Sequence, residues 1–490
     1  MYVRSVVVDT AARLGVRWVL ITAATVLAFW RTWQQVWSST IAGTAIGYVF
    51  VLPGLAVCAA VGVTLRRAGE LPIHDRQTDK IVGGLGVVIT LGIRFLLVPR
   101  FAEDYQRMQL DVSAAWLFAL SAAILVFGIR PVARYWPVWL LIVTMSPLLY
   151  RTLAILLGGQ RSAFGLIMVA TGAATTAIAV ARTRTRAAAG FVCTLVIGTS
   201  MLVVIDHLYP RAPLLVLQTA PALGATIAVQ AAFYLHHRRG RTKAPLQRPV
   251  RRPTTINSGL TFLAVFTAAA TLSAIPLPDQ HLIPVSHGPP PTSGPGLLMP
   301  AGWTQLAISD YQWPQRYFGP ESQLSRQTLR ADEPRPGWDQ HDRLRTVQVD
   351  ALTVANPAAL EVYPGRTFYP LQNARVSPAT AVDVGRGVTA EMYTVVDDTL
   401  LLTWSNLSFI WTRGPDIAQR VTLISVDNHD PGAYFPEPSP PMASNAANTL
   451  TVLFRGTLAV TDTSPNDQDQ DLLTTLARDL VITQYQPGPG

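Results

Sequence analysis

Long apolar runs before Pro278 constrain this chain more than any other feature. A bilayer core about 30 Å thick requires roughly 20 apolar residues of helix, because no water inside it can pair the backbone groups. The sequence therefore predicts about nine membrane spans of this kind. They lie near Val16–Trp30, Ile41–Leu65, Ile81–Val98, Val112–Ile129, Trp136–Tyr150, Gly165–Ala181, Ala187–Ile205, Ala212–Leu235 and Thr261–Leu277.

Charge divides the chain into two parts. Only 14% of the 490 residues are charged, compared with about 25% in soluble domains. Of the 30 acidic and 39 basic residues, 22 acidic and 13 basic residues lie from Asp279 onward. The basic excess is thus confined to the apolar half, in short loops between apolar runs, so it reports membrane orientation and does not predict a nucleic-acid partner. The bilayer itself is the expected partner.

The basic loops predict the orientation. They are Arg66–Lys80, Arg130–Arg134, Arg182–Arg186 and Arg238–Arg252, and they fall on alternate sides of the span count. Because cytoplasmic loops are enriched in Arg and Lys, this pattern places the N-terminus in the cytoplasm and everything after Pro278 outside. We expect a multi-pass protein of the cell membrane. Nearly all basic residues are arginines, which is typical of a GC-rich bacterial genome.

The second half is predicted to be an extracytoplasmic β-rich or α+β domain. Residues 278–300 form a Pro- and Gly-rich linker, which favours an extended spacer, and residues 301–490 form the domain. Alternating and β-branched runs predict strands, at Thr346–Val354, Thr389–Val396, Thr399–Trp404, Arg420–Val426 and Thr449–Val460. A helix is expected at Asp469–Ile482, with Asp467, Asp469 and Asp471 at its positive end.

Candidate reactive residues in the membrane half are few. Cys58 and Cys193 both lie in apolar runs, where a thiol is usually an inert hydrophobe, although Cys193 is also a candidate nucleophile. Arg94 lies about one turn from the outer end of the third span, where it either snorkels to the interface or lines a polar cavity. Five ionisable residues of outer loops either form a vestibule or are simply solvated: Arg151, Arg161, Asp206, His207 and Arg211.

The outer half offers one cluster of ligand-type side chains and many aromatic residues. The segment Asp427–Asp430 is interpreted as a hydrogen-bonded turn, with metal binding as the alternative. The aromatic residues are expected to form the core, or in part a groove for a peptide or sugar; they are Trp303, Trp313, Tyr317, Phe318, Trp338, Tyr363, Phe368, Tyr369, Tyr393, Trp404, Trp411, Tyr434 and Phe435.

Motifs of several enzyme classes are missing from the sequence. It contains no Walker A loop, dinucleotide fingerprint, Gly-x-Ser-x-Gly elbow, His-Glu-x-x-His or Cys-x-x-Cys. This argues against an ATP-driven pump and the common hydrolases, and predicts no cofactor and no metal. The catalytic residues of any reaction stay unknown at this point.

Three segments carry a resemblance to a known family. They are Pro72–Gly83, Val126-Phe127-Gly128-Ile129-Arg130 and Met145-Ser146-Pro147-Leu148-Leu149-Tyr150. Over about residues 71–151 the chain resembles the exosortase/archaeosortase family of multi-span proteins, which are related to cysteine transpeptidases and process C-terminal sorting signals of exported proteins. The resemblance implies protein sorting at the cell envelope, on exported clients or envelope components.

The sequence departs from the family where the chemistry is carried. Active members have a Cys followed by a small pair such as Ser-Gly, and later an Arg preceded by Asn. Here Thr194 and Leu195 follow Cys193, and no Asn-x-x-Arg lies downstream within the spans, so no catalytic residue is transferred. The chain is then a divergent or inactive relative, or one with a rebuilt site in which Arg151, Arg161 or His207 would activate a thiolate. The alternative is a non-enzymatic scaffold that presents an outer binding domain; a transporter ranks last because no internal repeat is visible.

Overall fold

The structure, a computed structural model, consists of two compact units. It describes residues 2–66, 76–238, 258–278, 283–290, 296–371, 374–414, 417–430, 432–441, 446–466 and 469–485. One unit, here called the membrane unit, comprises Met1–Pro99 and Met108–Pro278. The other, called the sheet unit, comprises Arg100–Arg107 and Asp279–Gly490. The first part of the motif Pro72–Gly83, Asp467 and most of the basic cluster Arg238–Arg252 lie outside the described residues.

Helices make up the described part of the membrane unit and the segment that leaves it. In chain order they are α1 (Tyr2–Ala28), α2 (Trp30–Ile41), η1 (Ala45–Phe50), α3 (Leu52–Arg66), α4 (Arg76–Gly92), the π-helical turn η2 (Ile93–Leu97), α5 (Val98–Arg100), α6 (Tyr105–Met108), α7 (Leu110–Phe127), α8 (Ile129–Ala133), α9 (Trp136–Thr144), α10 (Pro147–Leu156), α11 (Arg161–Val180), α12 (Arg184–Leu208), α13 (Leu214–Arg238) and α14 (Ser258–Ala274).

The predicted apolar spans are confirmed in coarse form. Among the described residues, 6 helices are long and apolar enough to cross a membrane, or up to 8 if two bent pairs each count as one span. The pair α1 and α2 is bent by 76°, and the pair α9 and α10 by 65°. The second bend falls at Pro147, whose ring removes a backbone donor and thereby interrupts the predicted fifth span. The helix Gly259–Ala274 is apolar but shorter than the others.

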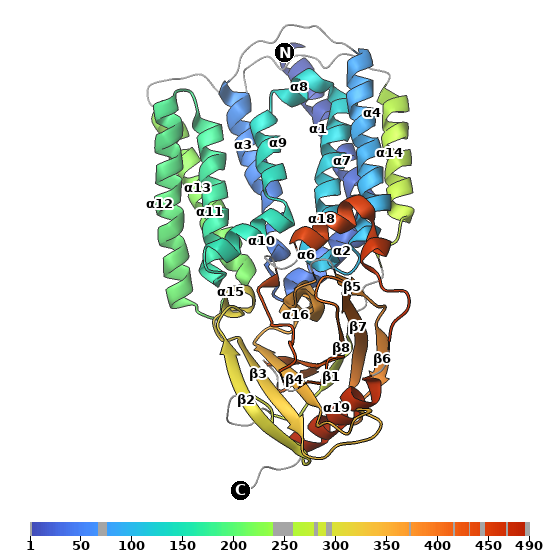
Figure 1. Ribbon diagram of the computed structural model, residues 1–490. Coiled ribbons are helices and arrows are strands. Elements are labelled where there is room, and N and C mark those ends of the chain that lie inside the picture. The colour runs from blue at the N-terminus through green and yellow to red at the C-terminus, as the bar shows by residue number, and fades with distance from the viewer. Residues whose placement is uncertain are drawn as a thin grey trace. The chain divides into compact units, whose positions relative to one another are not determined.

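The membrane unit contains two groups of packed helices (Figure 1). In one, α1, α7 and α14 share a core of small and aromatic side chains that includes Phe29 and Phe118. In the other, α3, α11, α12 and α13 approach closely through glycines. A Cβ on Gly62 would lie 2.4 Å from Cα of Ala179, so α3 and α11 touch backbone to backbone. Such small-residue contacts are how helices associate in lipid, where burial of apolar surface gives no driving force.

A nine-stranded sheet forms the sheet unit. Its strands are β1 (Val285–His287), β2 (Trp303–Tyr311), β3 (Gln323–Ala331), β4 (Thr346–Val354), β5 (Ala374–Val376), β6 (Thr380–Asp383), β7 (Thr389–Asp397), β8 (Leu402–Thr412) and β9 (Ala418–Val426). The order is β2-β3-β4-β9-β8-β7-β5, with β1 on β8 and β6 on β7, and every pair except β1–β8 is antiparallel. The helical elements are α15 (Gln315–Phe318), α16 (Ala358–Val362), η4 (Gly365–Phe368), α18 (Ala446–Arg455), η5 (Thr457–Val460) and α19 (Gln470–Gln484).

The predicted antiparallel sheet and its late helix are therefore confirmed, with two corrections. The strand predicted at Thr449–Val460 is wrong, because this segment forms α18 and η5. The strand predicted to begin at Thr399 instead begins at Leu402, because the Asp397 carboxylate accepts the backbone N–H groups of Thr399 and Leu400 and closes a turn there.

Part of the Pro- and Gly-rich linker is integrated into the sheet unit. Val285–His287 pairs with β8. The Arg413 guanidinium donates hydrogen bonds to the carbonyls of Pro289 and Pro290, at 3.0 and 3.1 Å. The extended backbone at Pro289 and Pro290 is thus held by a side-chain donor. This part of the predicted spacer is fixed to the sheet.

Candidate functional site

The sheet has two chemically different faces, because successive side chains of a strand point to opposite sides. On β8, Leu407, Phe409 and Trp411 belong to a buried core that includes Leu472, Leu476 and Leu480 of α19. The alternate residues Ser408 and Ile410 point to the other side, here called the second face. The second face carries buried charges as well as apolar groups, so it is the face on which a polar site can be built.

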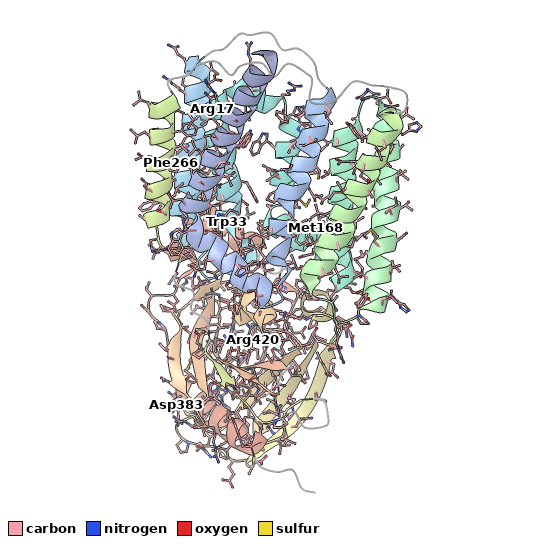
Figure 2. All side chains as sticks on the ribbon, turned by 180° about the vertical axis from the view of Figure 1, so that it is seen from behind. Arg17, Trp33, Met168, Phe266, Asp383 and Arg420 are labelled. Carbon is pink, nitrogen blue, oxygen red and sulfur yellow. The ribbon has the colours of Figure 1, made fainter. Side chains whose placement is uncertain are left out.

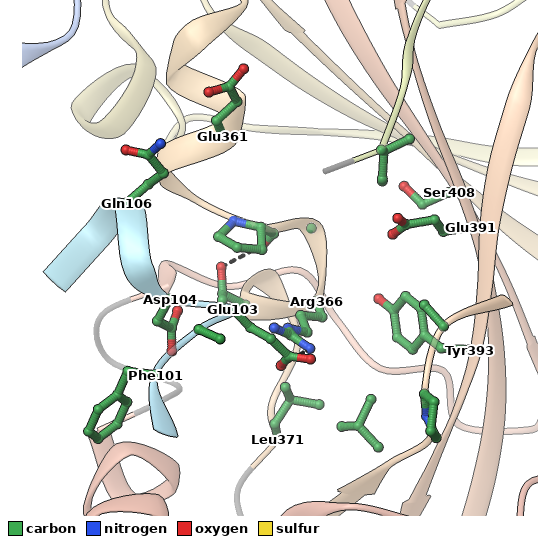
Figure 3. A pocket seen from close by; sticks show the side chains of 18 of the residues that line it. Phe101, Glu103, Asp104, Gln106, Glu361, Arg366, Leu371, Glu391, Tyr393 and Ser408 are labelled. Carbon is green, nitrogen blue, oxygen red and sulfur yellow. Dashed lines mark hydrogen bonds and ion pairs between the residues drawn. The ribbon is translucent and has the colours of Figure 1, made fainter. Parts of the chain in front are cut away.

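A pocket with a volume of about 350 Å³ lies on the second face. Its walls come from four parts of the sheet unit: the segment Arg100–Arg107, strands β7 to β9, the elements α16 and η4, and the segment α18–η5. Figure 3 shows Glu391, Tyr393 and Ser408 on neighbouring strands across from Glu361, Gln106 and Glu103. Apolar side chains complete the lining, among them Val285, Leu360, Leu371, Ile410 and Val452.

Arg420 of β9, labelled in Figure 2, fixes one wall of this pocket. Its guanidinium is buried and donates hydrogen bonds to the carbonyls of Leu360 and Tyr363, at 2.7 and 2.8 Å. These bonds hold α16 and the start of η4 against the sheet. Burial lowers the pKa of Arg420 to about 10, which still leaves it cationic at neutral pH. The pocket thus has a fixed positive charge in its wall.

A second wall comes from the segment Arg100–Arg107, which follows α5. Glu103 forms an ion pair with Arg366 of η4, and Figure 3 shows these two side chains directed at each other. Arg100 donates a hydrogen bond of 2.9 Å from Nη1 to the carbonyl of Leu453 in α18. An exposed ion pair alone would stabilise this segment little. Here the ion pair, the hydrogen bond of Arg100 and the buried side chain of Phe101 together hold the segment in the sheet unit. A loop between two membrane helices is in this way part of the sheet unit.

Carboxylates and an aromatic hydroxyl supply the remaining polar groups of the pocket. Partial desolvation raises the pKa of Glu361 above its usual value, and burial raises that of Tyr393 more strongly. The Ser408 hydroxyl lies 3.2 Å from the Val421 carbonyl and 3.1 Å from the Thr422 hydroxyl, neither of which is a base. No histidine, cysteine or lysine occurs among the described lining residues. The arrangement offers carboxylates and hydroxyls that can bind polar groups, and it places Glu391 directly across the β7–β8 pair from Ser408.

A buried ion pair braces the second face beside the pocket. Arg326 of β3 makes two bonds to the carboxylate of Asp350 on β4, at 2.6 and 2.7 Å, and a third to the Pro436 carbonyl at 2.9 Å. The Tyr369 hydroxyl donates to the same carboxylate at 2.6 Å. Burial alone would lower the pKa of Arg326, but the hydrogen bonds and charge of Asp350 raise it above its usual value. The charges compensate each other, which is the condition under which buried ions are tolerated.

The two predicted thiol candidates lie in the membrane unit, each on a different helix. Cys193 is exposed on α12, next to the exposed Val192 and one turn before the exposed Val196. Cys58 is partly buried in α3. An activated thiolate needs a cation or a helix N-terminus beside it, whereas the surface around Cys193 is apolar. The geometry therefore gives Cys193 the features of a lipid-facing residue.

The predicted vestibule forms only in part. Arg161, at the start of α11, donates to the carbonyls of Pro210 and Ala212, so it does reach the loop that carries Arg211. His207 and Arg211 are exposed there. Arg151, however, is buried within α10 and is not at the surface with them. Arg94 is also buried, at 2% exposure, and donates to the Ile275 carbonyl at the end of α14, at 3.0 Å. It points inward, toward a helix end.

Asp427–Asp430 forms a turn after β9. The Asn428 side chain accepts the backbone N–H of Asp430, and the Asp430 carboxylate pairs with Arg343. His429 Nδ1 lies 2.5 Å from a carboxylate oxygen of the buried Asp339. Within the described part of the chain, no group of three metal-ligating side chains is found. Of the aromatic residues, Trp404 and Trp411 are fully buried, and Trp313, Tyr317, Phe318, Tyr363 and Phe368 pack edge to face.

One polar group in the membrane unit was not predicted from the sequence. Tyr48 of η1 stacks on Tyr150 of α10 with ring centroids 3.8 Å apart. Gln218 of α13 donates to the Tyr150 hydroxyl at 2.9 Å and to the Ala45 carbonyl at 2.8 Å. The only sequence signal was the presence of polar residues inside apolar runs, which does not reveal which of them meet. This group links three helical elements in the interior.

Comparison of the chain with protein-family models, with curated proteins and with solved structures found no match.

Proposed function

We propose that this protein is a multi-pass membrane protein of the cell envelope that binds a peptide segment of an exported protein in the pocket of its sheet unit. The observation that carries this proposal is the pocket itself, with charged groups of both signs and apolar side chains in one lining. We propose binding as the role, because the Ser408 hydroxyl is engaged with the Val421 carbonyl and the Thr422 hydroxyl, although Glu391 is its cross-strand neighbour.

The lining favours a peptide over a small metabolite. An extended peptide offers backbone donors and acceptors together with alternating side chains. Glu361, Glu391 and Tyr393 provide acceptors and a hydroxyl, while Leu371 and Ile410 provide apolar contacts. Ligand sites of comparable volume are mostly apolar with a few placed polar groups, whereas this one has charged side chains on three of its four walls, and, among the described lining residues, only the wall from α18–η5 lacks them.

The two-part composition of the sheet unit supports the predicted topology. Arg100–Arg107 and Asp279–Gly490 belong to one compact body and so must lie on one side of a bilayer, which requires an even number of crossings between them. Four helices long and apolar enough to cross lie in that interval: Leu110–Phe127, Arg161–Val180, Arg184–Leu208 and Leu214–His236. Because the number of crossings must stay even, the bent pair α9–α10 and the short α14 must either both cross or both not cross. If both cross, six spans follow Arg107. Together with the bent pair α1–α2, Ala45–Leu65 and Gln77–Arg100, this gives the nine spans that the apolar runs predict.

With this count, the N-terminus lies on the opposite side from the sheet unit. The basic loops Arg130–Arg134 and Arg182–Arg186 fall on the same side as the N-terminus, which the positive-inside rule assigns to the cytoplasm. The sheet unit and its pocket are therefore extracytoplasmic, where exported proteins pass.

Site-specific photo-crosslinking tests the proposal. A photoreactive amino acid replaces Glu361, which is exposed at the pocket, in the full-length protein in intact cells. The matched control replaces Ile308, which is 40% exposed on β2 at the far edge of the sheet from β7. We expect an adduct from position 361 that protease digestion reduces to a short peptide, and none from position 308. Absence of a specific adduct, or an adduct that resists protease and behaves as a glycan or lipid, would contradict peptide binding.

A reaction of the exosortase type would need a thiolate and is tested separately. If Cys193→Ala abolished processing of a client that is still crosslinked at position 361, the protein would be an enzyme and the purely binding role would be wrong. We expect the variant to behave like the native protein, because Cys193 is on an apolar exposed surface.

A further inference from the structure

The segment α18–η5 exposes three large apolar side chains, here called the apolar stripe. Leu450 and Phe454, which are 55% and 79% exposed, lie four residues apart on one side of α18. Leu458, which is 81% exposed, follows in η5, after Gly456 with its φ of 85° has ended α18. Exposed leucines are common singly, but a row of large apolar side chains exposed to this extent usually marks an interaction surface.

The other side of the same segment faces the pocket. Thr449, Val452, Thr457 and Val460 all belong to the pocket lining, and Val452 is buried. The segment is thus a thin wall with the pocket on one side and an uncovered apolar stripe on the other. Whatever covers the stripe lies directly against the pocket.

Chain continuity links this wall to a candidate membrane span. The Leu453 carbonyl accepts a hydrogen bond of 2.9 Å from Arg100, within the sheet unit. Arg100 is the last residue of the apolar helix Gln77–Arg100, which is long enough to cross a membrane. The wall is therefore bonded to the residue at which this candidate span ends.

A second apolar protrusion lies beside this wall. Leu400 and Leu401, in the turn between β7 and β8, are 54% and 86% exposed. Leu401 has φ of 50°, a left-handed conformation that is unfavourable for leucine. Arg375 links the two protrusions, because it pairs with Asp398 in the turn at 2.9 Å and lies 3.9 Å from Asp462, just after η5. The turn therefore presents two large apolar side chains outward at the cost of an unfavourable backbone conformation.

We propose that the stripe Leu450–Phe454–Leu458, together with the Leu400–Leu401 turn, inserts into the lipid surface of the membrane that the same chain spans. Interfacial helices of this type bury their apolar side chains about 5–10 Å into the headgroup and acyl boundary. Arg455, the cation in the last turn of α18, is placed to meet lipid phosphates. The wall of the pocket is then in contact with lipid. If the pocket binds a peptide, as proposed above, that peptide is a segment next to a membrane anchor.

Depth-dependent fluorescence quenching tests the insertion. The full-length protein carries Cys58→Ala and Cys193→Ala, and Phe454→Cys provides a single thiol for an environment-sensitive fluorophore. The protein is reconstituted into phosphatidylcholine vesicles that contain lipids spin-labelled in the headgroup or in the acyl chain. The matched control is Ile482→Cys, an exposed apolar position on α19, which packs on the opposite face of the sheet.

We expect spin-labelled lipid to quench the probe at position 454 at least about twofold more than the probe at position 482, with Leu458→Cys matching position 454. Equal, weak quenching at positions 454, 458 and 482 would overturn the inference. Crosslinking from position 361 is measured in intact cells, where exported proteins are present: adducts without quenching would refute insertion alone, and quenching without adducts would refute only the peptide site. Because all three labelled side chains are exposed, their replacement leaves the packing of the sheet unit intact.

Discussion

The buried pair Arg326–Asp350 gives a sharp stability prediction. Asp350→Asn keeps the shape of the side chain and removes its charge. The carboxylate accepts two bonds from Arg326 and one from Tyr369, and all three side chains are nearly fully buried. A hydrogen bond to a charged group contributes roughly 1 kcal/mol more than a neutral one. Three such bonds amount to about 3 kcal/mol, and leaving one partner of a buried pair uncompensated costs about 3 to 5 kcal/mol.

Pulse proteolysis in urea measures this loss on the full-length protein in detergent, because cleavage within the sheet unit reports its open fraction. A loss of about 3 kcal/mol raises that fraction on the order of 100-fold. Asp398→Asn is the control, since it removes the charge from the exposed pair with Arg375, and we expect a much smaller shift there. The double variant Arg326→Leu with Asp350→Leu should recover much of the loss. An Asp350→Asn protein as stable as the native one would refute the view that this pair braces the second face.

Three further predictions follow from particular contacts. Gly62→Val should weaken the association of α3 with α11, because the new Cβ would overlap the Ala179 backbone, and we expect a lower melting temperature in detergent. The same substitution at Gly84, which has open space around it, should have little effect. Gln218→Leu should cost roughly 1 kcal/mol in the same assay, because it removes two interior hydrogen bonds. Burial opposes ionisation of Asp339, but hydrogen bonds from the His341 and Arg343 amides and from His429 lower its pKa well below the usual value. The ionised carboxylate therefore stabilises the fold above about pH 4, and this stability is lost as pH falls toward the folded-state pKa. In pulse proteolysis, the stability of the Asp339→Asn protein should fall less steeply on acidification than that of the native protein. An unchanged pH profile would contradict this.

Periodicity predicted the sheet where one face is apolar. Thr346–Val354 is the strand β4 with the predicted bounds, and β7, β9 and α19 differ from prediction by one or two residues at their ends. The alternating apolar side chains of β4, β7 and β9 pack in one core with α19. β2 was not predicted, because its apolar residues Leu306, Ala307 and Ile308 are consecutive and do not alternate with polar ones.

The segment Thr449–Val460 shows why strand propensity gave a wrong prediction. Its residues Thr451 and Val452 favour strands, yet the spacing of four between Leu450 and Phe454 is helical and matches the observed α18, which ends before Gly456 and η5. An exposed apolar stripe is unexpected in a water-soluble domain, so the pattern was easily assigned to a strand.

The pocket was beyond sequence reasoning, because it depends on contacts between distant parts of the chain. Arg100–Arg107 was expected to be a short loop between spans, and nothing in its sequence shows that Glu103 pairs with Arg366. From the sequence, Arg420 was predicted only to lie in a strand. Its position before the mostly apolar run Val421–Val426 could have indicated that one face of this strand carries a buried charge. Tyr393 was considered as an aromatic residue that packs or lines a groove, and it lines the pocket.

The claim most central to this account is that the pocket opens on the outer side of the membrane. Glu361→Cys, in a protein that also carries Cys58→Ala and Cys193→Ala, is treated in intact cells with a membrane-impermeant thiol reagent. Arg182→Cys, in a loop predicted to be cytoplasmic, is the control. We expect labelling at position 361 in intact cells and at position 182 only after permeabilisation. Labelling at position 182 in intact cells, with position 361 reached only after permeabilisation, would reverse the topology and contradict an outer binding site.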